Sequence, residues 1–287
     1  MSIPASFYEE MDRSVSYQKQ MGRVQLVRGE YPYAFPRNVR EFREAKARYW
    51  GLITLVDEMV GRVLRRVSEL GLGDNTIIVF TSDHGEMMGD HRMMSKIVEY
   101  EEAAKTPCLL RMPGQQKQMI IERRVAQVDL APTLLELMGQ PAPAHLQGRS
   151  WAPYLRSGAW WPSRDVSIEF LMFPTVDVRH PLHGRTLVTQ EGWKLSLSEV
   201  GGGELYNLSA DPQEMVNLFP RPEYRTRVEE LAGRLKRWQA STGDRVTLNP
   251  RSTSQWPVEW IDTLRRMNID FDRDLNKCWP ETGPSRR

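Results

Sequence analysis

The 287-residue sequence has little cysteine and no concentration of charge of one sign. Its two cysteines, Cys108 and Cys278, are too few for a disulfide scaffold, and Cys108 lies in an apolar run typical of a small core residue. Lys and Arg number 39 against 37 Asp and Glu, for a formal net charge of +2. Without a block of like charges, the sequence gives no reason to expect nucleic acid as a partner.

Long hydrophobic runs are also absent. No segment approaches the roughly 20 consecutive apolar residues of a membrane-spanning helix, so we expect no membrane span. The residues after Met1 turn polar and acidic at once, without the apolar core of a secretory signal. As written, the sequence predicts a cytoplasmic protein. A true start upstream of Met1 would make a periplasmic or secreted location an alternative.

What the sequence does contain is an alternation of helical and strand-like periodicity. Apolar residues recur at steps of three and four in one segment, and short apolar, strand-like runs bounded by turn residues follow it. The predicted elements are a helix at 45–70, strands at 76–81, 107–112 and 125–128, and a helix that Asp129 caps. This order predicts an α/β fold, with part of a mixed, mostly parallel sheet flanked by helices.

A second group of elements follows a segment rich in Pro, Gly and Trp that ends near Pro162. Strand-like runs at 185–190 and 193–198 are joined by a short Glu-Gly turn, which indicates a hairpin. Residues 225–238 place apolar side chains on one helical face, which predicts a terminal helix.

Polar residues with metal-binding chemistry follow the strand at 76–81. In open α/β sheets, ligands bind beyond the carboxyl ends of the strands, where Asp83 and His84 are expected. Carboxylate and imidazole groups both bind divalent metals, and Gly85 allows a sharp turn after them. Taken by themselves, these residues are equally compatible with an ordinary polar turn.

The pattern that continues from this turn resembles the sulfatase family of the alkaline phosphatase superfamily. The matching residues are Ser82-Asp83-His84-Gly85-Glu86, Gly89-Asp90-His91, Lys96, Tyr100-Glu101, Pro107 and Pro113-Gly114. Lys96 follows Asp83 by 13 residues, as in family members whose metal ligands are Asp and His. The resemblance implies that Asp83 and His84 bind the active-site metal and that Lys96 is a catalytic residue contacting the sulfate. His91 would face the substrate or form a hydrogen bond within its loop.

The resemblance also implies a division of the chain. Residues 1–162 would be the C-terminal part of the sulfatase α/β catalytic domain. Residues 163–245 would form a small α+β subdomain, in which Glu204-Leu205-Tyr206-Asn207-Leu208 matches the family's C-terminal antiparallel sheet. Residues 246–287 would be a partly disordered extension.

The family's nucleophile is missing from this sequence. It is a Cys or Ser, converted to formylglycine, in a Cys/Ser-x-Pro-x-Arg motif, and neither Cys108 nor Cys278 has that context. The acidic pair that supplies the family's first metal ligands is absent too. The resemblance therefore implies the C-terminal half of a sulfatase, which alone would bind metal weakly, turn over no substrate, and expose an unpaired strand edge and an apolar face.

The function implied is hydrolysis of a sulfate ester of a small molecule or saccharide, with a divalent metal. Calcium is the first expectation for the ion, and manganese or zinc are alternatives. One alternative function is a phosphonate monoester or phosphodiester hydrolase of the same superfamily. Another is a non-catalytic split product that binds a partner, such as the missing N-terminal half. His180 and His183 resemble a leaving-group loop of the family, although an exposed loop is the favoured interpretation.

Overall fold

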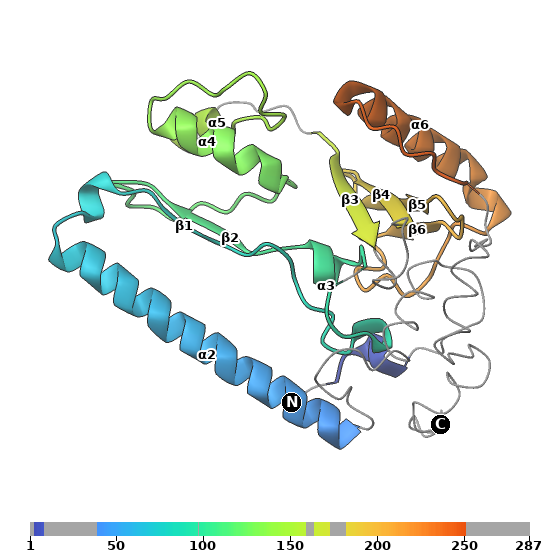
Figure 1. Cartoon of the computed structure of the whole chain (residues 1–287), viewed down its shortest axis with the longest axis horizontal. Helices are drawn as coiled ribbons and strands as arrows, with labels where there is room; N and C mark the ends of the chain where they lie inside the picture. Colours follow the sequence, from blue (N-terminus) through green and yellow to red (C-terminus); the bar gives the residue numbers. More distant parts are fainter. Residues whose placement is uncertain (1–2, 9–38, 97, 159–163, 173–181, 251–287) are drawn as a thin grey trace.

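The computed structural model describes residues 3–8, 39–96, 98–158, 164–172 and 182–250 (Figure 1). The main elements are α2 (Val39–Glu69), β1 (Ile78–Thr81), α3 (Glu101–Ala104), β2 (Cys108–Arg111), α4 (Leu130–Leu137), α5 (Ala152–Ser157), β3 (Val166–Met172), β4 (Leu182–Val188), β5 (Trp193–Ser198), β6 (Glu204–Asn207) and α6 (Arg225–Thr242). They confirm the predicted mixture of helices and sheets. None of the helices in these ranges has the length and apolar character needed to cross a bilayer. His180, Cys278 and most of the predicted extension lie outside the described residues.

Helix α2 confirms the predicted amphipathic helix and begins six residues earlier, at Val39. Glu41 in its first turn and Arg66 in its last turn complement the helix dipole. The helix ends before Gly71, whose φ of 68° is the left-handed conformation that glycine adopts without strain. Phe42 is its only buried residue and packs against Phe7, with ring centroids 4.8 Å apart. Helix α2 therefore forms as its apolar stripe predicted, but the described residues do not bury that stripe.

Strands β1 and β2 pair antiparallel in a two-stranded sheet, with the register Ile78↔Arg111 to Thr81↔Cys108. The sequence predicted mostly parallel pairing, and the described strands form no parallel pair. The chain turns back after β1, so that β2 runs beside β1 in the opposite direction. The strand predicted at 125–128 is wrong: a 3-10 turn, η4 (Gln127–Asp129), lies there because side-chain hydrogen bonds fix that backbone.

Helices α4 and α5 cover one face of this small sheet (Figure 1). Leu110 of β2 packs into a cluster around Trp151 and Leu155. Asp129 precedes α4 as predicted, but its side chain does not cap the helix. Instead its buried carboxylate accepts hydrogen bonds from the backbone N–H of Ala126 and of Arg149, at 3.2 and 2.8 Å. It also pairs with Arg164, so this carboxylate ties three segments together.

Strands β3, β4, β5 and β6 form a four-stranded antiparallel sheet in sequence order. The β4–β5 hairpin and helix α6 confirm the predictions from periodicity. Leu231 and Leu235 of α6 pack with Leu187, Leu195 and Leu205 on one face. A second buried cluster, formed by Met87, Met93, Val98, Tyr100, Ala103, Val188, Tyr206 and Leu208, joins the segment after β1 to this sheet. Figure 1 shows α6 and α3 on different sides of it.

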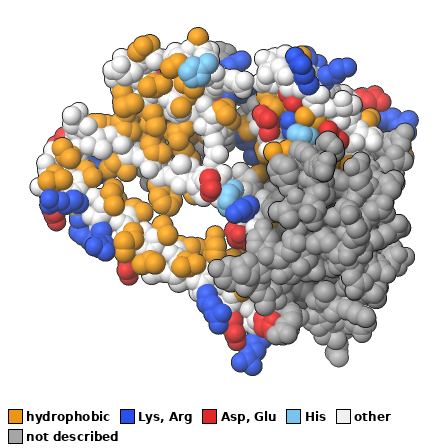
Figure 2. Space-filling view, viewed as in Figure 1, with side chains coloured by type: hydrophobic (Ala, Val, Ile, Leu, Met, Phe, Trp, Pro, Cys, Tyr) orange, Lys and Arg blue, Asp and Glu red, His pale blue; other side chains and the backbone are white. Residues whose placement is uncertain are grey.

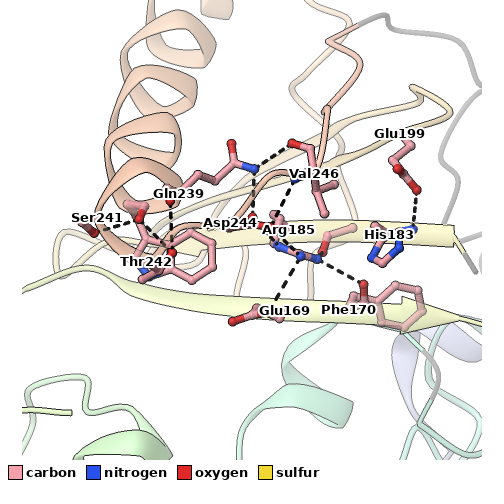
Figure 3. Close-up of polar contacts among 12 residues, drawn as sticks. Glu169, Phe170, His183, Arg185, Glu199, Gln239, Ser241, Thr242, Asp244 and Val246 are labelled. Atoms are coloured by element: carbon pink, nitrogen blue, oxygen red, sulfur yellow. Dashed lines mark hydrogen bonds and ion pairs between the residues drawn. The ribbon is translucent and has the colours of Figure 1, made fainter. Parts of the chain in front are cut away.

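A buried arginine fixes the end of α6 to this sheet (Figure 3). Arg185 of β4 donates two hydrogen bonds to Asp244, from Nε to Oδ2 at 2.9 Å and from Nη2 to Oδ1 at 3.0 Å. Gln239 donates to the same carboxylate at 2.9 Å. His183 lies on β4 rather than in an exposed loop, and its backbone N–H donates to Glu199 at 2.9 Å. Arg185 therefore links β4 to the residues that follow α6.

The predicted apolar face is exposed. Nine apolar residues of α2 are exposed: Tyr49, Trp50, Leu52, Ile53, Leu55, Val56, Met59, Val63 and Leu64. On the small sheet, Phe80 is 38% and Leu109 65% exposed. Figure 2 shows apolar side chains gathered along α2 and along the central strands, on either side of a hollow. We call the nine α2 residues together with Phe80 and Leu109 the α2–sheet surface.

Candidate active site

The candidate site begins where β1 ends, directly after Thr81. Asp83 projects its carboxylate into solvent, with a side chain that is 82% exposed. The backbone N–H of His84 donates to Asp83 Oδ1 at 2.9 Å. This hydrogen bond is the main cause that lowers the pKa of Asp83 below its ordinary value. Asp83 is therefore an ionised carboxylate at neutral pH, as a metal ligand must be.

His84 is oriented by the backbone beside it. Its Nδ1 lies 2.8 Å from the carbonyl oxygen of Gly85, which can only accept a hydrogen bond. Nδ1 must therefore carry the proton in the neutral ring, and Nε2 keeps its lone pair. Nε2 lies 3.5 Å from Asp83 Oδ2. A carboxylate oxygen and an imidazole nitrogen thus lie side by side, as in metal sites whose histidine is fixed through its other nitrogen.

Gln127 braces this turn from η4. Its amide Nε2 donates to the carbonyl oxygen of Ser82 at 2.6 Å. The same nitrogen lies 3.3 Å from Thr106 Oγ1, next to β2. The hydroxyl of Ser82 in turn donates to the carbonyl oxygen of His84 at 2.8 Å. Sequence reasoning missed Gln127, because it lies in a segment whose β-branched neighbours indicated a strand.

Gly85 brings the site against α3. Its N–H donates to the carbonyl oxygen of Ala103, and that of Glu86 donates to Glu102, at 2.8 and 2.9 Å. A Cβ atom added at Gly85 would lie 1.9 Å from the Glu102 carbonyl oxygen. Only glycine fits so close an approach. The C-terminal carbonyls of α3 accept hydrogen bonds from the turn that follows Asp83 and His84.

A buried cation fixes α3 in turn. Lys194 of β5 has a side chain that is 1% exposed, and its Nζ lies 3.1 Å from Glu101 Oε1 and 2.9 Å from Glu214 Oε1. Burial opposes the charged form of Lys194, but the two carboxylates more than offset it and hold the pKa of Lys194 above its ordinary value. Glu214 also accepts the N–H of Glu101 at 2.7 Å. The turn after Asp83 and His84 thus contacts α3, and α3 is held in place by a charge cluster centred on Lys194 of the second sheet.

Glu86 shapes the loop that presents Lys96. Its carboxylate accepts hydrogen bonds from the backbone N–H of Met88, at 3.4 Å, and of Ser95. The N–H of Met87 donates to the carbonyl oxygen of Ser95 at 2.8 Å, which closes the loop. Lys96 follows at once, with an exposed side chain. An exposed ammonium group on a closed loop is available to an anionic substrate.

His91 lies in a different environment from the other predicted site residues. Its side chain is 2% exposed, and its ring stacks on Tyr100 with centroids 4.1 Å apart. Its φ of 49° lies in the left-handed region, in the 3-10 turn η3 (Asp90–Arg92). The structure brings Asp83 and His84 together and gives His91 a packed position, so its substrate-binding role stays a prediction.

The donors present account for part of a metal site. No group of three or more His, Cys, Asp or Glu residues with metal-binding geometry occurs in the part of the chain that the structure describes. Asp83 and His84 supply one oxygen and one nitrogen, both accessible to solvent. They fit a divalent ion as two of its ligands, and further ligands would have to come from other residues, water or substrate.

Comparison with known families gives two matches. The sequence profile of the family described as "Sulfatase" matches residues 16–140. The profile described as "N-sulphoglucosamine sulphohydrolase, C-terminal" matches residues 89–241. The two overlap across the segment that carries Lys96. Together they span both the candidate site and the four-stranded sheet.

Individual relatives agree with these matches. The chain is 33% identical over 228 residues to a multifunctional alkaline phosphatase superfamily protein, PehA, of Trinickia caryophylli, covering 75% of this chain and 44% of that protein. It is 31% identical over 199 residues to an N-acetylglucosamine-6-O-sulfatase of Bacteroides thetaiotaomicron, covering 68% and 36%. The solved phosphonate monoester hydrolase of Agrobacterium radiobacter superposes with a TM-score of 0.61 at 27% identity, over 70% of this chain and 42% of that one. The chain thus spans less than half the length of each.

Proposed function

The chain belongs to the sulfatase family, and from this membership we propose that it takes part in the hydrolysis of a sulfate ester. In this proposal Asp83 and His84 hold a divalent metal ion and Lys96 contacts the sulfate. The observation that carries it is the arrangement at the end of β1, where the Asp83 carboxylate lies 3.5 Å from Nε2 of His84 while Nδ1 of the same ring contacts the Gly85 carbonyl oxygen. An ordinary polar turn would not require that arrangement or the brace from Gln127.

The residues of this chain have separate parts in the proposed chemistry. Enzymes of this family generally use a divalent metal ion and a formylglycine nucleophile, and the ion polarises the sulfuryl oxygens when it is bound. Asp83 and His84 would hold that ion. The ammonium group of Lys96 would stabilise negative charge on the transferring group or the leaving oxygen. His91 is proposed to face the substrate only after a local change that opens its packed position.

Calcium is the ion we propose first, with manganese and zinc as alternatives. Carboxylate oxygen suits all three, and the imidazole of His84 is better matched to manganese or zinc than to calcium. Because the chain supplies two donors where a hard cation usually takes six or more, we expect weak binding to this chain alone.

We propose that turnover needs a nucleophile and further metal ligands beyond those that the described residues provide. The sequence contains no Cys/Ser-x-Pro-x-Arg nucleophile motif, and the described residues contain no third metal ligand at the site. We therefore propose that the 287 residues alone do not hydrolyse sulfate esters. A sulfated saccharide is the proposed substrate of the whole enzyme, supported by the Bacteroides relative, which is a sulfatase of N-acetylglucosamine-6-O-sulfate groups by name.

Two other functions have observations in their favour. Likeness to the Agrobacterium phosphonate monoester hydrolase supports cleavage of a phosphonate monoester or a phosphodiester, whose anionic group would bind the same residues. The exposed α2–sheet surface supports a non-catalytic protein that binds a partner. Cleavage of a phosphonate monoester or phosphodiester rather than a sulfate ester would distinguish that hydrolase from a sulfatase. Metal binding at Asp83 would distinguish either hydrolase from the non-catalytic protein.

Metal binding is the direct test of the proposed site. Titration of the 287-residue protein with Mn²⁺, followed by electron paramagnetic resonance, should show one weak site, with a dissociation constant on the order of a millimolar. Asp83→Asn and His84→Gln should abolish it. Asp74→Asn, an exposed carboxylate in the turn before β1, is the matched control and should leave it unchanged. Equal binding by wild type and Asp83→Asn would refute the proposed metal site.

A further inference from the structure

The loop from Glu86 to Lys96 has an unusual backbone. Four non-glycine residues with positive φ occur in the part of the chain that the structure describes, and three of them lie in this loop: Met88, His91 and Ser95, with φ of 41°, 49° and 69°. Left-handed backbone costs free energy in residues that carry a side chain, so it persists only where surrounding contacts hold it. Such residues cluster at functional sites, and Ser95 directly precedes Lys96.

The contact that holds Ser95 comes from Glu86. The carboxylate oxygen Oε1 of Glu86 accepts a hydrogen bond from the N–H of Ser95 and a longer one, of 3.4 Å, from the N–H of Met88. We propose that Glu86 is a positioning residue, which holds Ser95 in the left-handed conformation and thereby directs the side chain of Lys96 toward the substrate. This role rests on the proposed function, in which Lys96 contacts the sulfate.

Two hydrogen bonds fix the backbone just before Lys96. The N–H of Ser95 donates to Glu86, and the carbonyl oxygen of Ser95 accepts the N–H of Met87 at 2.8 Å. That carbonyl belongs to the same planar peptide unit as the N–H of Lys96, so its orientation sets the direction in which the chain continues. If Ser95 rotated to the ordinary negative φ, this unit would turn and the ammonium group of Lys96 would move with it.

The rest of the loop is anchored by other contacts. Met87 and Met93 are buried beneath it, at 0% and 1% exposed, and the N–H of Gly89 donates to the carbonyl oxygen of Met93 at 2.7 Å. These contacts remain when Glu86 is replaced. Loss of the Glu86 acceptor should therefore release Ser95 locally and leave the base of the loop in place.

Sulfate binding at Lys96 tests this role in the 287-residue protein. Acetic anhydride acetylates free amines, and mass spectrometry gives the acetylation rate of Lys96 separately from the rates of the other lysines. Inorganic sulfate, added at constant ionic strength, should slow the reaction at Lys96, and the concentration that gives half-maximal protection measures the affinity. Glu86→Leu should raise that concentration by about fivefold or more, the effect of losing one hydrogen bond.

Glu86→Gln separates hydrogen bonding from charge. Glutamine and leucine are both neutral and similar in size, but only glutamine has an oxygen that can accept the Ser95 N–H. Loss of a negative charge beside the loop would by itself favour an anion, so charge alone predicts tighter sulfate binding in both variants. The positioning role predicts that Glu86→Gln binds sulfate at least as tightly as the wild type and that Glu86→Leu binds it more weakly.

Two further variants complete the comparison. Glu86→Ala also lacks the acceptor and should behave like Glu86→Leu, so the result does not depend on how one bulky side chain fits. Glu229→Ala removes an exposed carboxylate from α6 and should leave the protection of Lys96 unchanged. Urea denaturation should show a cooperative transition for every variant.

A second measurement reports the backbone of Ser95 without any sulfate. In protein with isotope-labelled serine, the nuclear Overhauser effect between the amide proton and Hα of one residue is strong at positive φ and weak at negative φ. For Ser95 it should be strong in the wild type and in Glu86→Gln and weak in Glu86→Leu.

Other results would overturn the positioning role. These are an unchanged Ser95 signal in Glu86→Leu, sulfate protection of Lys96 that is equal in the wild type and Glu86→Leu, and equal weakening in Glu86→Gln, which would assign the effect to charge. The proposed function fails differently. If sulfate did not protect Lys96 of the wild type, its sulfate contact would be refuted, while a Ser95 signal that Glu86→Leu abolishes would still show that Glu86 positions the backbone of Lys96.

Discussion

Lys194 and Glu214 form a buried ion pair, with Nζ and Oε1 2.9 Å apart and both side chains 1% exposed. The pair matters to the candidate site because Glu101, the first residue of α3, shares the same lysine. Helix α3 in turn receives the backbone of Gly85 and Glu86. The charge cluster therefore connects the second sheet to the turn that carries Asp83 and His84.

Lys194→Met should destabilise the protein strongly. Removing one partner of a buried ion pair leaves an uncompensated charge, which costs about 3–5 kcal/mol. The free energy of unfolding, measured by urea denaturation, should fall by that order. Glu69→Gln is the control, since Glu69 pairs with Arg66 at 3.0 Å on the exposed surface of α2. That variant should lose at most about 0.5 kcal/mol. Similar losses in the two variants would contradict a stabilising role for the buried cluster.

Gly85→Ala should disrupt the candidate site and the fold around it. The new Cβ would lie 1.9 Å from the Glu102 carbonyl oxygen, so the turn must move away from α3 and lose its backbone hydrogen bonds. We expect a loss of about 1–3 kcal/mol in the free energy of unfolding and loss of Mn²⁺ binding. Gly51→Ala is the control, because nothing lies within 4 Å of its Cβ position in α2. It should stabilise the helix by about 0.5–1 kcal/mol. Normal metal binding by Gly85→Ala would show that the close approach is dispensable.

Much of this architecture could be predicted from local patterns. The three- and four-residue spacing identified α2, and short strand-like runs bounded by turn residues identified β1, β2 and the β4–β5 hairpin. What failed depended on contacts between distant segments. Residues 125–128 have strand propensity, yet Gln127 bonds to the Ser82 carbonyl 45 positions earlier, and that contact fixes a 3-10 turn. Asp129 has the identity of a helix cap, but Arg149 and Arg164 draw its carboxylate into the interior.

The candidate site was predictable in part for the same reason. Asp83 and His84 are adjacent in sequence at the end of a strand, so their proximity needs no tertiary information. The brace from Gln127 and the support from Lys194 come from segments far along the chain. His91 shares the Gly-Asp-His pattern of a polar loop, and its stacking on Tyr100 follows from three-dimensional packing that no local pattern reports.

Acid should weaken the contact between α6 and the second sheet. Burial alone would raise the pKa of Asp244, but hydrogen bonds from Arg185 and Gln239 outweigh it, so the pKa lies below its ordinary value of 3.8. A carboxyl group whose pKa is lower in the folded state stabilises the fold at pH values above its unfolded-state pKa. That contribution is lost as the pH falls below about 4. The free energy of unfolding of the wild type should therefore drop between pH 4 and pH 2. Asp244→Asn should be less stable at pH 7 and should lose less on acidification. If the free energy of unfolding of Asp244→Asn fell as steeply on acidification as that of the wild type, the titrating group would be another residue.

Gln127→Ala should weaken metal binding while leaving both ligands in place. The Gln127 amide holds the Ser82 carbonyl at 2.6 Å, and the Ser82 hydroxyl holds the His84 carbonyl at 2.8 Å, so the brace acts on the ligands through the backbone. Groups that orient metal ligands typically change affinity by about 10–100-fold when removed. Gln127 is exposed, so we expect the lower end, about tenfold, in the Mn²⁺ titration. Gln140→Ala removes an exposed glutamine after α4 and should have no effect. A positioning role also predicts that Gln127→Glu, which replaces the donor with an acceptor facing the Ser82 carbonyl, binds Mn²⁺ no better than Gln127→Ala. If the added negative charge alone governed affinity, Gln127→Glu would bind more tightly than the wild type, and the brace would have to be abandoned.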